Sequence, residues 1–195
     1  IDVYSDTICP WCYIGYVKLN NALKYFNDLS FDVVWRPFQL NPNITKDGMN
    51  RDEYLNKKFG GQEKALSVYK KIEEEGRLTN IYFQFSKIKK TPNTFLSHKL
   101  LAFAHKKHKQ NEVLDSIFYQ YFIEGSDIGD LEKLIKIAKQ TEIYEDSVQD
   151  YLLSDEDNES LINEANQASG FGISGVPCFI FNKEFVISGA QPVEN

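Results

Sequence analysis

Two cysteines three positions apart, Cys9 and Cys12, stand where a strand-prone segment meets a helical one. Residues 1–6 form a short β-prone run, and after Pro10 apolar residues recur at the spacing of one helix face. The residues of this face are Cys12, Tyr16, Leu19, Leu23 and Phe26. Proline suits the first helical position, where its fixed φ and its missing N–H do no harm. The segment therefore predicts a strand over 1–6 and then a helix that runs to about Asn27 and begins at the cysteine pair.

The predicted position of Cys9 favours the reactive form of a thiol. Unpaired backbone N–H groups and the helix dipole stabilise negative charge at a helix N-terminus, so a thiolate is stabilised there. Cys12 lies one turn further along the same side of the helix, where we expect it to be more buried. The spacing lets the two sulfurs form a disulfide. We therefore predict Cys9 as the attacking nucleophile and Cys12 as the resolving thiol of dithiol–disulfide exchange.

Two other interpretations of the pair remain open from the residues alone. A C-x-x-C pair supplies half of a zinc site, but a closed site needs two further ligands. The other candidate ligands are Cys178 and three histidines, and the chain has no second C-x-x-C pair. Two incidental core cysteines are the second alternative. The strand–helix context favours redox chemistry over both, so we predict no metal site and no cofactor besides the Cys9–Cys12 disulfide.

Length and composition fit a folded protein that needs no disulfide framework. The chain has 195 residues, of which 42% are hydrophobic and 26% charged, as in ordinary globular proteins. Its net charge of −6 gives no support to nucleic-acid binding, and we find no run of about 18 apolar residues that predicts a membrane span. The sparse cysteines favour a cytoplasmic protein. Because the chain opens on Ile1, we expect trimmed upstream residues, and an exported protein without its signal peptide is the alternative.

The order of predicted elements indicates an α/β domain interrupted by helices. A strand over 31–38 follows the first helix, so the resulting β-α-β unit should hold two parallel strands joined by a right-handed crossover. We expect a capping box at Asn50 and a helix that ends at Gly60, and we expect Gly76 to end the next helix. Further helices are predicted over 62–75, 92–108, 111–124, 130–140, 145–153 and 156–169. A strand that ends at Phe181 and a second over 185–188 complete the chain as a hairpin.

The tripeptide Gly175-Val176-Pro177 is the second feature with chemical meaning. Pro177 stands just before a strand, where a missing N–H is normally a liability. A cis Val176–Pro177 bond accounts for that position, since cis proline marks a tight turn. Such a turn would lie beside Cys9, with the backbone of Val176 free to pair with an extended substrate segment. An ordinary trans bond is the alternative.

The residues quoted above carry a resemblance to a known family. The run from Asp6 to Gly15 resembles the active-site signature of DsbA-family thiol:disulfide oxidoreductases, in particular their FrnE-like branch. Further segments fit the same family in the same order, namely 37–42, Pro92-Asn93-Thr94 with His98, 175–177 and 188–192. The resemblance implies an α/β thioredoxin-like fold with a large all-helical insertion, the redox pair Cys9 and Cys12, and Pro177 as the cis-proline. We therefore expect a thioredoxin-like domain over 1–42 and 155–195 and a helical insertion over 43–154.

Two departures from the family pattern bear on the site and on the fold. Cys178 follows the expected cis-proline, where the family usually has another residue, so it is either an accessory thiol or, as we favour, a small buried core residue. The chain also stops at Asn195, where the family usually closes with a further helix. We expect that helix to be absent or disordered.

Three further residues are candidates for the site, one in a later segment and two inside the cysteine motif. His98 is either an accessory residue that faces the site cleft or, as we favour, a histidine that is structurally bonded or lies at the helix surface. Pro10 and Trp11 lie between the cysteines, and we predict both as motif residues that contact substrate, with Trp11 at the surface of the site.

These observations lead to three functional hypotheses. The leading one is a thiol:disulfide oxidoreductase that acts on protein, peptide or small-molecule dithiols and disulfides, with glutathione as a further expected co-substrate. The alternatives are a glutathione-dependent isomerase or transferase of the related branch and a non-catalytic chaperone or binding module. The relatives behind the first alternative generally carry serine at the first motif position, which counts against it.

Overall fold

Strand β1 (Asp2–Ser5) lies inside a four-stranded sheet of order β2-β1-β5-β6. The other strands are β2 (Val34–Pro37), β5 (Cys178–Phe181) and β6 (Phe185–Ser188). β2 runs parallel to β1, with Val3 opposite Trp35, whereas β5 is antiparallel to β1 and to β6. The computed structural model, which describes residues 1–194, thus confirms the parallel pair and the C-terminal hairpin.

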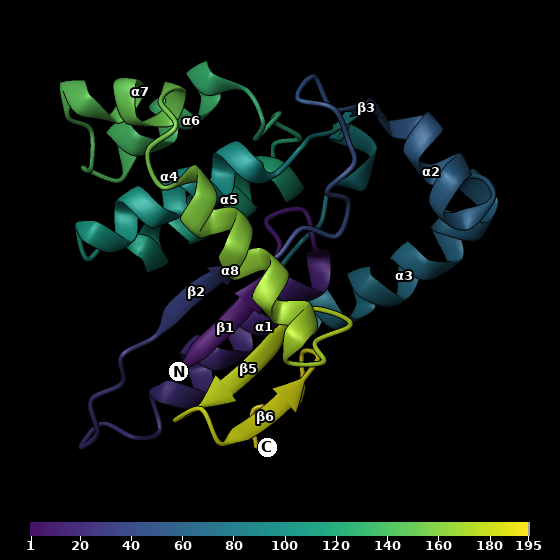
Figure 1. The fold of residues 1–195 in the computed structure, drawn as a ribbon. Helices are drawn as coiled ribbons and strands as arrows, with labels where there is room; N and C mark the ends of the chain where they lie inside the picture. Colours follow the sequence, from purple (N-terminus) through teal and green to yellow (C-terminus); the bar gives the residue numbers. More distant parts are fainter. Residues whose placement is uncertain (195) are drawn as a thin grey trace.

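Helices cover both faces of this sheet (Figure 1). Because side chains alternate along a strand, Val3 and Phe179 belong to one face, while Tyr4 and Cys178 belong to the other. Helix α1 (Pro10–Leu23) packs on the first face, where Gly15 meets Phe179. Helix α8 (Asn158–Gly170) covers the second face, and its Ala168 joins a small buried cluster with Tyr4 and Cys178.

The segment between β2 and α8 is helical and packs against the sheet and α1. Its helices are α2 (Arg51–Phe59), α3 (Gln62–Leu78), α4 (Phe95–Lys106), α5 (Gln110–Phe122), α6 (Leu131–Gln140) and α7 (Asp146–Leu153). The ring of Tyr13 in α1 stacks on that of Phe118 in α5, with centroids 5.0 Å apart. One buried cluster therefore spans the sheet and the helical segment. The division of the chain at residues 43 and 154 stays a prediction.

Helices α1 and α3 end at residues other than those that the sequence predicts. α1 stops at Leu23 instead of Asn27, and Phe26 is 53% exposed, so no neighbouring element buries the last predicted turn. Gly76 lies inside α3, which continues to Leu78, and therefore does not end that helix. A Cβ atom at Gly76 would come within 2.6 Å of the ring of Phe83, so this glycine serves close packing.

The loops that flank α2 and α3 form a small element that the sequence did not predict. Strands β3 (Met49–Asn50) and β4 (Lys90–Thr91) pair antiparallel, and a short 3-10 helix, η1 (Phe85–Lys87), precedes β4. Asn50 caps the helix as predicted, since its side chain accepts hydrogen bonds from the amides of Asp52 and Glu53. The Glu53 carboxylate pairs with Lys57 at 2.7 Å, so the other half of the predicted capping box is not seen. The predicted helix end at Gly60 is also confirmed, with φ of 74°.

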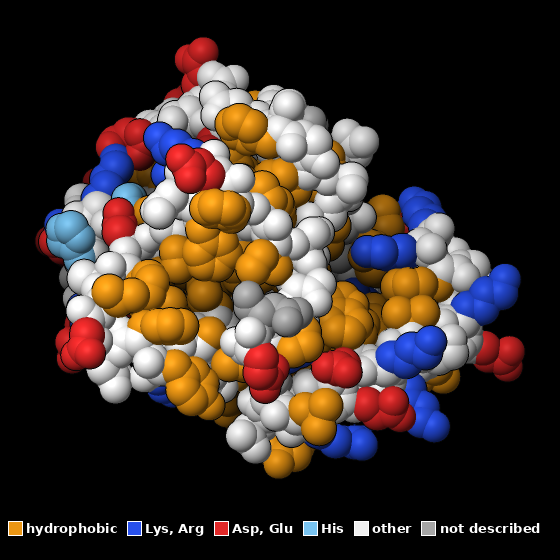
Figure 2. Space-filling model, turned by 90° about the horizontal axis from the view of Figure 1, so that it is seen from below, with side chains coloured by type: hydrophobic (Ala, Val, Ile, Leu, Met, Phe, Trp, Pro, Cys, Tyr) orange, Lys and Arg blue, Asp and Glu red, His pale blue; other side chains and the backbone are white. Residues whose placement is uncertain are grey.

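Large hydrophobic side chains are exposed at the end of the sheet that carries the α1–β2 loop and the β5–β6 turn. They include Tyr25, Phe26, Leu29, Phe31, Phe185 and Val186. Figure 2, viewed from below, shows hydrophobic side chains across one face of the molecule. Cys9 follows the opposite end of β1, so the exposed residues of this loop and turn lie far from the cysteine pair. Within residues 1–194, no helix has both the length and the apolar character that a membrane crossing requires.

Candidate active site

Cys9 and Cys12 lie at the N-terminal end of α1, as the sequence predicts. Cys9 is the N-cap residue and Pro10 is the first residue of the helix. The Cys9 amide donates to the backbone oxygen of Asp6 at 3.0 Å, and the Cys12 amide donates to the backbone oxygen of Cys9 at 3.0 Å. The turn after β1 thus fixes Cys9 at the N-terminal end of the helix. Trp11 is partly buried and packs against the main core.

The two thiols differ in their surroundings. Both are free, with Cys9 5% exposed and Cys12 completely buried. Burial raises the pKa of Cys12 well above its ordinary value, and a hydrogen bond with Cys9 adds to this, while the Ser5 hydroxyl acts in the opposite direction. Cys12 therefore keeps its proton under conditions where an exposed thiol would lose it. This difference fits a pair in which Cys9 reacts with the substrate and Cys12 reacts only with Cys9.

The turn before β5 lies against Cys9. The Val176–Pro177 peptide bond is cis, as predicted, and the Cys9 thiol donates to the Val176 carbonyl oxygen at 3.7 Å. Gly15 makes this approach possible, because a Cβ atom there would lie 2.9 Å from Cγ of Pro177. Two segments from opposite ends of the chain thus meet at one sulfur atom.

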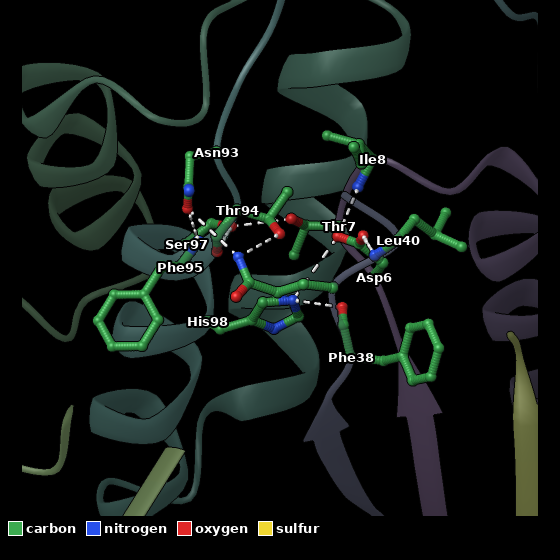
Figure 3. A network of polar contacts seen from close by, with 11 residues as sticks. Asp6, Thr7, Ile8, Phe38, Leu40, Asn93, Thr94, Phe95, Ser97 and His98 are labelled. Atoms are coloured by element: carbon green, nitrogen blue, oxygen red, sulfur yellow. Dashed lines mark hydrogen bonds and ion pairs between the residues drawn. The ribbon is translucent and has the colours of Figure 1, made fainter. Parts of the chain in front are cut away.

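A buried carboxylate holds the residues just before Cys9. Asp6 has no exposed surface, and its Oδ2 accepts from the Leu40 amide at 2.7 Å while its Oδ1 accepts from the Ile8 amide at 3.4 Å. Nε2 of His98 lies 3.6 Å from the same Oδ1 (Figure 3). Asp6 thereby joins the turn before α1 to the segment that follows β2.

His98 takes part in this polar network and is 4% exposed. Its Nε2 lies 3.0 Å from the carbonyl oxygen of Phe38. A carbonyl only accepts hydrogen bonds, so Nε2 carries the hydrogen in this contact. Figure 3 shows the ring of His98 pointing toward Phe38 and Asp6. The geometry favours the structurally bonded histidine over one that faces a cleft.

A second contact connects α4 to the same turn. The hydroxyls of Thr7 and Ser97 lie 2.8 Å apart, and both residues are buried. The side chain of Gln39 donates to Asn93 at 3.2 Å, next to the start of α4. These bonds explain why the segments that resemble the family motif lie together in space.

Comparison with known proteins places the whole chain in one family. The sequence pattern described as the DSBA-like thioredoxin domain matches residues 1–195. The chain belongs to the DSBA-like thioredoxin domain family. Its fold is therefore the expected α/β thioredoxin-like fold with a mixed sheet and a helical insertion.

Individual proteins align with this chain along most of their length. The chain is 26% identical to the uncharacterized protein YwbO of Bacillus subtilis (strain 168), with 97% of this chain and 90% of YwbO aligned. A probable DsbA oxidoreductase from Streptomyces coelicolor superimposes with a TM-score of 0.89 at 26% identity, over 99% of this chain and 84% of that one. The cytosolic disulfide reductase DsbM from Pseudomonas aeruginosa, in a structure with GSH, gives a TM-score of 0.69 at 15% identity, over 96% and 88% of the two chains.

Cys178, the third cysteine of this DSBA-like chain, lies on the other face of the sheet. It is 3% exposed and belongs to the cluster with Tyr4, Ala168 and Ile173, which is distinct from the core that contains Cys9 and Cys12. Burial raises the pKa of the Cys178 thiol. Both observations favour a small packed core residue over an accessory thiol.

Two residues of the site escaped the sequence analysis. Asp6 was predicted as the end of a strand and the start of the family motif but was given no role, and its signal is an acidic residue between a strand and a cysteine pair. Gly15 was noted only as part of the family motif, and its signal is a glycine inside an apolar helical pattern. Within the described part of the chain, no group of three His, Cys, Asp or Glu side chains is arranged to hold a metal ion.

Proposed function

We propose that the protein is a thiol:disulfide oxidoreductase in which Cys9 is the nucleophile and Cys12 the resolving thiol. The observation that carries the proposal is that the Cys9 sulfur, at the N-terminal end of α1, contacts the carbonyl oxygen of Val176. Membership of the DSBA-like family, whose relatives include a probable DsbA oxidoreductase, supports the same chemistry.

The exchange proceeds through one mixed disulfide. The Cys9 thiolate attacks one sulfur of a substrate disulfide, so the substrate S–S bond breaks and one substrate thiolate leaves. Cys12 then loses its proton and attacks Cys9, which forms the Cys9–Cys12 disulfide and releases the second substrate thiolate. Two electrons pass from the protein to the substrate. Oxidation of a dithiol substrate follows the same steps in reverse.

Substrate binding has a proposed place beside the reacting sulfur. Val176 is partly exposed and its carbonyl oxygen faces Cys9. We propose that an extended segment of a protein or peptide substrate pairs with the backbone at Val176, while Pro10, Trp11 and Pro177 line its path. Such pairing would hold the substrate sulfur near Cys9 independently of most side chains.

The proposal also names a reductant and a branch of the family. We propose glutathione as a co-substrate that reduces the Cys9–Cys12 disulfide, which the bound GSH of the distantly similar DsbM supports. The order of motifs from Asp6 to Pro192 supports the FrnE-like branch. A cytoplasmic location stays a prediction from the sparse cysteines.

The test compares the Cys9→Ser variant with Cys178→Ala in insulin reduction and in oxidation of a dithiol peptide. Cys9→Ser removes the nucleophile and should abolish turnover in both assays. Cys178→Ala removes an equally buried thiol from the other face of the sheet and should retain turnover within a factor of two or so. Unchanged turnover in Cys9→Ser would refute the proposed function.

A further inference from the structure

A pocket of about 550 Å³ opens in the helical segment, between α2, α3 and the residues around η1. None of the described residues that line it belongs to α1 or to the Val176–Pro177 turn. Its volume lies within the usual range for small-molecule sites, about 300–1,000 Å³. The proposed redox reaction gives this pocket no role.

One wall of the pocket is aromatic. The ring of Tyr69 stacks on that of Phe85, with centroids 4.3 Å apart and planes 16° apart. Phe85 in turn stacks on Phe83 at 4.9 Å and 9°. All three residues line the pocket, and Phe85 is sandwiched between the other two rings, so this wall offers ring edges to a ligand. The face of an aromatic ring packs favourably against such edges.

The guanidinium group of Arg51 lies at the same pocket. Arg51 is the first residue of α2 and is only 9% exposed. It donates to the hydroxyls of Thr91 and Tyr69 and lies over the rings of Tyr54 and Tyr69, 5.2 and 5.4 Å from their centroids. Among the residues that the structure describes, none brings a carboxylate within 4.0 Å of this group.

The guanidinium group of Arg36, unlike that of Arg51, has carboxylate partners. Arg36 pairs with the carboxylates of Asp2 at 2.7 Å and Glu164 at 2.5 Å, although its side chain is more exposed than that of Arg51. A buried cation without a carboxylate is unfavourable, and aromatic ring faces offset only part of the loss. Arg51 is therefore a buried positive charge whose anionic partner the described chain does not supply.

The acidic residues of the pocket do not pair with Arg51. Asp52 and Glu73 line the pocket, but Asp52 is exposed and accepts a hydrogen bond from Gln62 at 2.8 Å, and Glu73 is partly exposed. Lys89 adds a second cation to the lining. A guanidinium presents a planar fork of N–H donors that matches a carboxylate with two parallel hydrogen bonds.

We propose that this pocket binds a small planar carboxylate. The carboxylate group pairs with Arg51, and the ring of the ligand packs against the wall of Tyr69, Phe85 and Phe83. The site is separate from Cys9 and Cys12, so its occupation does not depend on the redox state of the pair.

The test uses 2-naphthoate and its neutral analogue 2-naphthamide on the unaltered full chain. Calorimetry should show 2-naphthoate binding at least tenfold more tightly than the amide. In NMR spectra of the side-chain Nε–H groups, 2-naphthoate should shift the signal of Arg51 and leave that of Arg36, which is already paired, unchanged. Equal affinity of the two compounds, no binding of 2-naphthoate at millimolar concentration, or shifts at Arg36 alone would overturn the proposal.

Two variants test whether the charge of Arg51 binds the carboxylate. Arg51→Gln should weaken 2-naphthoate binding at least tenfold, whereas Arg77→Gln, an exposed arginine in the last turn of α3, should leave it unchanged. Circular dichroism checks that both variants fold. If Arg51→Gln does not fold, the comparison of the acid with the amide in the wild type decides the question. Equal binding by a folded Arg51→Gln variant would refute the site.

Discussion

The Cys9 sulfur and the Val176 carbonyl oxygen lie 3.7 Å apart, although 167 positions separate these residues in the chain. The contact joins the start of α1 to the turn before β5, and it depends on close packing between Gly15 and Pro177. Because an attacking sulfur needs a substrate in a defined position, we expect changes in this packing to affect the chemistry of Cys9 even where Cys9 is untouched.

Gly15→Ala tests the packing directly. In an exposed helix this change usually stabilises a protein by up to about 1 kcal/mol. Here the added Cβ atom would lie 2.9 Å from Pro177 and 3.1 Å from Phe179. We expect the free energy of unfolding to fall by about 1–3 kcal/mol, measured by urea denaturation, and insulin reduction to slow.

Gly170→Ala is the matched control for this change. Gly170 is the last residue of α8, and a Cβ atom there would meet nothing within 4 Å. Its stability and its insulin reduction should equal those of the wild type or exceed them slightly. If Gly15→Ala behaved like Gly170→Ala, the close approach of Pro177 to α1 would have no consequence for the site.

Asp6→Asn tests the buried carboxylate. Both Asp6 oxygens accept backbone hydrogen bonds, from Ile8 and from Leu40, and an amide offers only one acceptor oxygen. One buried N–H group then faces an NH₂ group, at a loss of about 1–3 kcal/mol in the free energy of unfolding. Urea denaturation measures this loss. The exposed Asp47→Asn variant is the control and should match the wild type in this measurement.

Gln110→Ala tests how the helical segment is fixed to the sheet. The Gln110 side chain accepts from the Trp35 amide at 2.9 Å and donates to the Trp35 carbonyl at 3.0 Å, so it occupies the place of a neighbouring strand beside β2. Its removal leaves two buried backbone groups unpaired, and we expect a loss of roughly 2 kcal/mol or more in urea denaturation. Gln149→Ala, in an exposed position of α7, should change stability by no more than about 0.5 kcal/mol. Similar losses in the two variants would argue against this role of Gln110.

The buried thiol of Cys12 predicts a pH dependence of the reduced protein. Its pKa is raised in the folded state, chiefly by burial, whereas the unfolded chain loses this proton near pH 8.5 or so. The corresponding stabilisation is complete below that pH and is lost as the pH rises toward the folded-state pKa. From about pH 7.5 to about 9.5, the reduced wild type should lose roughly 1 kcal/mol more than Cys12→Ala. Equal losses by urea denaturation would contradict the raised pKa.

The sequence predicted those features that rest on local chemistry. The start of α1 at Pro10 follows from the restricted φ of proline, and the cap at Asn50 follows from its side-chain oxygen. The cis bond at Val176–Pro177 was predicted from the position of proline before a strand. In each case the decisive residue determines its own backbone geometry.

The features that were missed depend on partners distant in the chain. Gly76 was predicted to end a helix, but contact with Phe83 explains why glycine stands there inside α3. The role of Asp6 depends on Leu40, and its sequence neighbours give no sign of that bond. The end of α1 at Leu23 reflects the lack of a surface to cover Phe26. Such contacts are set by tertiary packing, which periodicity and residue propensity do not report.

Trapping the mixed disulfide in a Cys12→Ser variant tests the proposed cycle most directly. Without Cys12, the adduct that forms when Cys9 attacks oxidised glutathione has no internal thiol to resolve it. Peptide mass spectrometry should find one glutathionyl group, located on Cys9, and Cys9→Ser treated in the same way should carry none at either motif position. An adduct on Cys178 with Cys9 unmodified, or no adduct at all, would contradict the assignment of Cys9 as the nucleophile.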